Sequence, residues 1–236
     1  ISKLWWIQFP FHLRLITKIR FFASFGAGGV IYLTSLIFNN IGFSATEIGL
    51  GFTTSAILGT LTRFFTGNYL NKIARIHIPL VISSLISILA GFFLIISKDI
   101  YFYIIGQALI GAAAGIYWPT AEFVVPYFCH PIDTRKAYAL VRSSEALGIF
   151  LGVFIGGFMN NFIYLKSIFI NDIFCMLTII LLILRNKNSI QNTLENSQKK
   201  ALDLITSHND TWNKNTIKIV SSIVLITTSL ALIQVT

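Results

Sequence analysis

The sequence predicts an all-α membrane protein built as a six-helix transmembrane bundle. Composition is the first reason, because 55% of the residues are hydrophobic and only 11% are charged, whereas soluble domains carry about 25% charged residues. The second reason is a series of six apolar stretches, each about as long as a bilayer core requires. The third is the alternation of basic and nearly uncharged loops between them. Despite a net charge of +9, we expect no nucleic-acid partner, because the charges lie in short loops and not on one amphipathic face.

The apolar stretches define the expected domain organisation. Pro119 is expected to kink or end the fourth span. Because the chain begins with Ile1 and ends inside an apolar run, we expect a fragment whose C-terminal six-span half is missing. The six spans are expected at residues 18–38, 47–67, 77–97, 100–125, 138–159 and 163–185, after a cytoplasmic N-terminal arm at 1–17 and before a cytoplasmic linker at 186–216, with one short amphipathic helix around 200–207, and the start of a truncated seventh span at 217–236.

Basic residues indicate how the spans are oriented. They gather in the N-terminal arm and after the second, fourth and sixth spans, whereas the other loops hold few charges. Cytoplasmic loops of membrane proteins are enriched in lysine and arginine. The sequence therefore predicts a multi-pass protein of the plasma or inner membrane with a cytoplasmic N-terminus.

Glycines recur four residues apart in the fifth span. Residues at this spacing share one face of a helix, and a face without side chains lets another backbone approach closely. We therefore predict a helix-packing face formed by Gly148, Gly152, Gly156 and Gly157.

Charged residues inside spans are rare and usually functional. Arg142 and Glu145 are three residues apart in the fifth span and can pair, and Glu122 lies near the end of the fourth. Two interpretations stay open for these groups: contact with substrate or a proton, or a static ion-pair network that snorkels towards the headgroups. For Arg63 we favour the static role, and we expect Asp172 to reach the periplasmic interface.

Three segments resemble the major facilitator superfamily of transporters. The first is GNYLNKIARI after the second span, where Asn71 replaces the family's acid and Ala74 its second glycine. The second is QALIGAAAGIYWP in the fourth span, where Gln107 stands in place of an arginine. The third is the glycine-rich fifth span, in which Val153 replaces a proline. The residues that fit the three patterns are Gly67, Lys72, Arg75, Gly111, Gly115, Pro119, Arg135, Ala137 and the four glycines of the packing face.

The resemblance implies the N-terminal half of a secondary transporter that works by alternating access. In the family, spans one, two, four and five line the central cavity, which would bring Glu122, Arg142 and Glu145 together as substrate or proton sites. The loop of Gly67, Asn71, Lys72 and Arg75 would act as a gating element, weakened by the loss of the acid at position 71. Uncharged candidates for substrate contact are Tyr32, Gln107 and Trp118, for which helix packing is the alternative.

The function predicted is secondary active transport of a small organic solute, coupled to protons, with the lipid bilayer as the surrounding partner. We expect no cofactor, no metal and no enzymatic activity, because the chain carries no nucleotide-binding loop and no hydrolase or metalloprotease motif. The alternatives are a non-transporting receptor or assembly protein on a transporter fold and, less favoured, an intramembrane enzyme.

Overall fold

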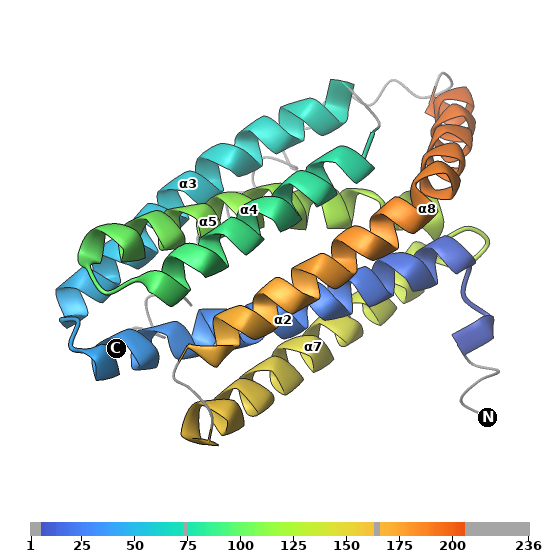
Figure 1. Ribbon diagram of the computed structural model, residues 1–236. Coiled ribbons are helices and arrows are strands. Elements are labelled where there is room, and N and C mark those ends of the chain that lie inside the picture. The colour runs from blue at the N-terminus through green and yellow to red at the C-terminus, as the bar shows by residue number, and fades with distance from the viewer. Residues whose placement is uncertain (1–5, 73–74, 163–165, 206–236) are drawn as a thin grey trace, which may run out of the picture. The chain divides into compact units, whose positions relative to one another are not determined.

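The computed structural model describes residues 6–72, 75–162 and 166–205. These segments form six helices of 20 to 39 residues and one short helix, with no strand among them (Figure 1). The bundle lies within residues 1–197, which form one compact unit. The expected start of a seventh span, 217–236, lies outside the described residues. The helices are α2 (Phe11–Ile41), α3 (Ala45–Lys72), α4 (His77–Ile96), α5 (Ile100–Phe123), α6 (Val125–Phe128), α7 (Thr134–Phe162) and α8 (Ser167–Ile205).

The first helix begins earlier than the sequence suggested. Pro10 precedes the first residue of α2, a place where its fixed φ and missing N–H cost little. Leu13 and Ile16 are buried in the bundle core, so residues 11–17 belong to the helix and not to a surface arm. At its other end α2 stops at Gly42, whose φ of 105° places it in the left-handed conformation that glycine favours at a helix end.

Helix α3 begins with a reciprocal cap. Glu47 accepts hydrogen bonds from the backbone N–H of Ser44 at 2.8 Å and from its hydroxyl, and the Ser44 hydroxyl accepts the N–H of Glu47 at 3.3 Å. This capping box satisfies N–H groups that a helix start leaves unpaired. By length and apolarity, α2, α4, α5, α7 and α8 can cross a membrane. At 28 residues α3 has the length, but its threonines, glycines and polar ends make it less apolar.

Pro119, Pro126 and Asp133 lie in and between helices α5, α6 and α7. Pro119 lies inside α5, which continues to Phe123, so the expected end of the helix at this proline is not observed. Pro126 falls in the first turn of the short helix α6, where proline is tolerated. The side chain of Asp133 accepts the N–H of Arg135 at 2.8 Å, which caps the start of α7.

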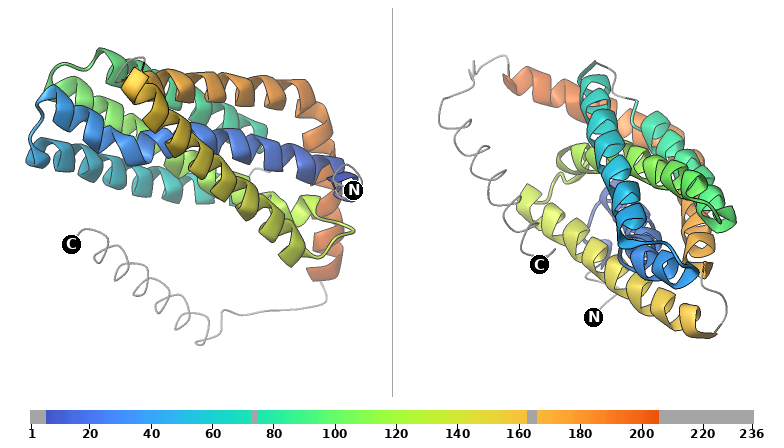
Figure 2. Two further views of the ribbon diagram at one scale, coloured as in Figure 1. Left: turned by 90° about the horizontal axis from the view of Figure 1, so that it is seen from below. Right: turned by 90° about the vertical axis from the view of Figure 1, so that its left-hand side faces the viewer.

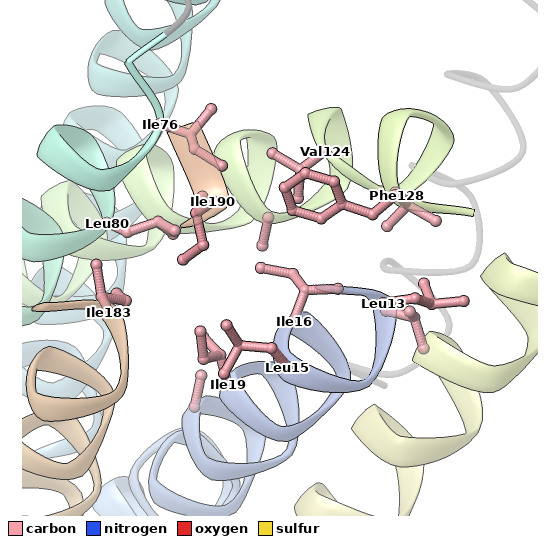
Figure 3. Packing of buried hydrophobic residues seen from close by; sticks show 14 of the residues in the cluster. Leu13, Leu15, Ile16, Ile19, Ile76, Leu80, Val124, Phe128, Ile183 and Ile190 are labelled. Carbon is pink, nitrogen blue, oxygen red and sulfur yellow. The ribbon is translucent and has the colours of Figure 1, made fainter. Parts of the chain in front are cut away.

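Helix α8 runs without interruption to Ile205. The expected polar linker is therefore helical over residues 186–205. Ile190 and Leu194, four residues apart, are buried in the same core cluster as Ile183. Figure 3 shows Ile183 and Ile190 near Ile76 and Leu80 of the α4 region. This apolar stripe explains why the polar stretch 186–197 continues as a helix against the bundle.

Three helix pairs make the main contacts: α2 with α7, α3 with α5, and α4 with α5 (Figure 2). We call the end of the bundle where α2 begins the Arg20 end, and the opposite end the Lys166 end. The larger apolar cluster lies at the Arg20 end. At the Lys166 end, the buried Lys166 ammonium donates to the carbonyl oxygens of Ile95, at 2.9 Å, and Ser97. A cation is favourable beside the unpaired carbonyls at the end of α4.

Candidate functional site: an ion-pair ring beside an apolar cavity

Four charged side chains form a closed ring at the Arg20 end of the bundle. Arg20 of α2 donates to Glu122 of α5 at 3.1 Å and to Glu145 of α7 at 2.9 Å. Arg142 of α7 donates to the same two carboxylates, at 2.5 Å and 3.0 Å. Each carboxylate thus contacts both arginines, and the two positive and two negative charges cancel.

The ring is buried on one side and open on the other. The Arg20 side chain is 1% exposed, whereas the side chains of Glu122 and Arg142 are 41% and 55% exposed. Removing one partner from a buried ion pair is costly because it leaves an uncompensated charge, whereas an exposed pair contributes little. Arg20 therefore holds the ring to the core, and Glu122 and Arg142 form its accessible edge.

Arg20 is the functional residue that the sequence reasoning missed. In the sequence it lies two residues after Lys18, at the start of the first expected span, and looks like one more basic residue flanking that span. The structure places its guanidinium over the ring of Trp118, 4.9 Å from the ring centroid, a favourable arrangement for a cation. A signal was available, because two acids and one arginine in the fourth and fifth spans leave one negative charge without a partner.

A partly open cavity of about 310 Å³ lies beside the ion-pair ring. Side chains of α2, α3, α4, α5 and α8 line it, and Trp118 both lines it and stacks on Arg20. Its walls are largely apolar and aromatic, which is typical of sites for small organic molecules. The polar side chains among its lining residues are Ser55, Ser83, Ser87, Gln107, Tyr117, Trp118 and Asp172.

Asp172 does not reach the periplasmic interface as we had expected. It is 2% exposed and accepts a hydrogen bond from the hydroxyl of Ser87 on α4 at 3.0 Å. The close approach of α2 makes this burial possible, because a Cβ on Gly26 would overlap the Asp172 carboxylate. The expectation failed because it placed the sixth span at the periphery, whereas the first turns of α8 face α2 and α4.

The remaining candidates are dispersed. Tyr32 on α2 is exposed and does not line the cavity, and Arg63 on α3 is exposed as well. Gly67 and Glu122 line one shallow depression of about 470 Å³ at the Arg20 end. Asn71 and Lys72 are the last two residues of α3, and Arg75 follows it on the surface.

The predicted packing glycines lie against α2, with one exception. A Cβ on Gly148 would lie 2.7 Å from the backbone oxygen of Phe21, and one on Gly152 would overlap the oxygen of Phe25. Gly156 faces Leu33, which also belongs to α2. For Gly157, in contrast, no atom of the described residues lies within 4 Å of an added Cβ. A second close contact joins α3 to α5, where Gly59 meets Gly111 and Gly115.

Comparison with known proteins decides the family. Residues 19–236 match the family model described as Major Facilitator Superfamily, which is most of the chain. The chain belongs to the major facilitator superfamily. No curated protein matches it. As a major facilitator with five helices long and apolar enough to cross a membrane among its described residues, it is a multi-pass integral membrane transporter.

Proposed function

We propose that this major facilitator carries out secondary active transport of a small organic solute by alternating access, driven by a proton gradient. The observation that carries the proposal is the cavity of about 310 Å³ with its aromatic walls and few polar groups. A volume of this size lies at the lower end of the range for small-ligand sites. In transporters of this kind the solute binds near the middle of the membrane, and the bundle moves around it.

The ion-pair ring supports the coupling part of the proposal. Protonation of Glu122 would remove its charge and break two of the four ion pairs, one with Arg20 and one with Arg142. Arg142 is the more exposed arginine, so its guanidinium is free to turn towards another acceptor. Binding of a proton would thus favour an arrangement of the Arg20 end in which these two ion pairs are broken. A ligand shifts a two-state equilibrium only if it binds one state better than the other, and the proton would do so here. Glu145 contacts the same two arginines and is the second proton-accepting candidate.

We further propose that the Arg20 end faces the cytoplasm. Basic residues at this end are Lys18 in the early turns of α2, Arg75 between α3 and α4, and Arg135 and Lys136 in the first turn of α7. The opposite end carries Glu47 and Asp99 besides its lysines. This asymmetry follows the rule that cytoplasmic segments are enriched in basic residues. We propose that the half-buried Gly67 and the exposed Arg75, with Asn71 and Lys72 at the end of α3, gate the cytoplasmic side.

The experiment that tests the proposal is uptake by the complete protein in sealed vesicles. Labelled sugars, amino acids, carboxylates and amines are supplied one at a time, with and without an imposed pH gradient. We expect the gradient to drive accumulation of at least one solute. Glu122→Gln and Glu145→Gln are each expected to abolish this accumulation while solute exchange without a gradient continues.

The control is Asp133→Asn, which removes a charge at the same end of the bundle but outside the ion-pair ring. Its accumulation should equal that of the wild type. If both glutamine variants accumulate solute as the wild type does, the assignment of the ring to proton coupling is wrong. If no solute crosses in any condition, the transport proposal itself fails for this chain.

A further inference from the structure

Asp172 is a buried carboxylate whose hydrogen bonding is incomplete. Its Oδ2 atom accepts the Ser87 hydroxyl at 3.0 Å, whereas its Oδ1 atom is buried without a partner. Burial of an ionised group is costly unless it is paired, and intramembrane acids usually face a cavity or a partner. Among the described residues, therefore, no donor satisfies this oxygen.

The surroundings of Asp172 offer no cation. None of the residues that line the cavity is a lysine, an arginine or a histidine. The buried Arg20 pairs with Glu122 and Glu145, although its Nη1 atom has no partner among the described residues. The groups that face Asp172 from the helices packed around it are Gly26 of α2 and Ser87 of α4. Within the described residues, the charge of Asp172 is thus left for a ligand to neutralise.

The cavity also presents an unused donor. Gln107 of α5 is 2% exposed and lines the same cavity as Asp172, and its Nε2 group is buried without an acceptor. Apolar and aromatic side chains, among them Phe52, Tyr117 and Trp118, form the rest of the wall. One cavity is therefore lined by an acidic acceptor, an amide donor and apolar and aromatic side chains.

We propose that this cavity binds an organic amine in its protonated form. The ammonium group donates to the Asp172 carboxylate, the apolar or aromatic body lies against Trp118 and Phe52, and a hydroxyl or carbonyl oxygen of the solute accepts from Gln107. A bare proton on Asp172 would need neither the volume of about 310 Å³ nor the amide of Gln107. The inference rests on the proposed transport function, to which it adds the chemical class of the solute.

The test uses four probes of similar shape that differ in charge or in one hydroxyl: 2-phenylethylamine, 2-amino-1-phenylethanol, 2-phenylethanol and 3-phenylpropionate. Binding to the complete protein in detergent is followed by tryptophan fluorescence, because Trp118 lines the cavity. We expect the two amines to bind at least about tenfold more tightly than the alcohol or the carboxylate, since a hydrogen bond to a charged group exceeds a neutral one by about that factor.

Three variants separate the contributions. Asp172→Asn keeps an acceptor for Ser87 and removes only the charge, so it should lose about tenfold in amine affinity and melt no lower than the wild type. Gln107→Leu should cancel the advantage of the hydroxylated amine over the plain one. Ser87→Ala retains the carboxylate and should still prefer amines. Asp133→Asn, outside the cavity, is the matched control for the loss of a carboxylate.

Several results would overturn the inference: equal affinity for amine and alcohol, unchanged amine binding in Asp172→Asn, or no amine binding to the wild type. Gradient-driven uptake of some other solute, with no amine preference, would leave the transport proposal standing and remove this one. Amine binding that depends on Asp172, without transport of any solute, would support the amine site and contradict the transport proposal.

Discussion

Gly148 offers the sharpest test of how α2 and α7 are held together. A Cβ added at this position would lie 2.7 Å from the Phe21 backbone oxygen and 2.9 Å from the Ser24 Cβ. Ordinary contact between carbon and oxygen begins at about 3.3 Å, so the two helices must separate by roughly 0.6 Å for Gly148→Ala to fit. Backbone atoms cannot turn aside as a flexible side chain can. We expect a loss of about 1–3 kcal/mol in the free energy of unfolding, the usual cost of overpacking.

Gly157→Ala is the matched control nine residues along the same helix. Nothing lies within 4 Å of its added Cβ, and alanine favours a helix over glycine by about 0.5–1 kcal/mol. The two variants should therefore differ by about 2–4 kcal/mol, with Gly148→Ala the less stable. The assay is thermal unfolding in detergent, followed with a thiol-reactive dye, since both cysteines, Cys129 and Cys175, are buried. Equal midpoints, or a lower midpoint for Gly157→Ala, would refute the backbone contact as the reason for glycine at position 148.

Three further predictions use the same assay. Arg20→Met leaves two carboxylates to share Arg142, so we expect a loss of about 3–5 kcal/mol in the free energy of unfolding. Arg20→Lys should recover only part of it, because an ammonium lacks the two-armed geometry of the guanidinium. A smaller loss for Arg20→Met than for Arg142→Met would contradict the buried role of Arg20. Lys166→Met leaves the Ile95 and Ser97 carbonyls without their donor and should cost about 1–3 kcal/mol; a neutral effect would mean that water replaces the ammonium. Hydrogen bonds from the Arg135 side chain and backbone N–H lower the pKa of Asp133. The ionised Asp133 therefore stabilises the fold above the unfolded-state pKa of about 3.9. This stabilisation is lost as the pH falls through the lower folded-state pKa. The wild-type unfolding midpoint should therefore fall more steeply than that of Asp133→Asn below about pH 4, and parallel pH profiles would contradict the cap.

The helical bundle could be predicted from the sequence because each span is long, apolar and bounded by turn or charged residues. Helix limits were less accurate, since a helix can continue beyond the apolar run. At the start, Leu13 and Ile16 bury against the core within a segment that its charges made look like an arm. At the end, Ile190 and Leu194 form an apolar stripe inside a polar segment, and the average composition concealed it.

From the residues alone, the candidate site could be predicted only for groups close together in the chain, whereas the grouping of Glu122 with Arg142 and Glu145 was implied by the family resemblance. Arg142 and Glu145 are one turn apart, so their pairing follows from the helical period. Arg20 and Asp172 depend instead on which helix faces which, and that is decided by small residues such as Gly26 and Gly148 at distant positions. The sequence shows these glycines but not their partners, and so the location of both charged groups had to come from the structure.

The glycine contacts also limit where a solute can pass through the bundle. Between α2 and α7, and again between α3 and α5, main chain touches main chain, and no film of water fits between surfaces in such contact. A hydrated solute is thereby excluded from both seams. Under the proposed transport function, the solute passes instead by way of the cavity, whose wall includes Trp118 beside the Arg20 guanidinium.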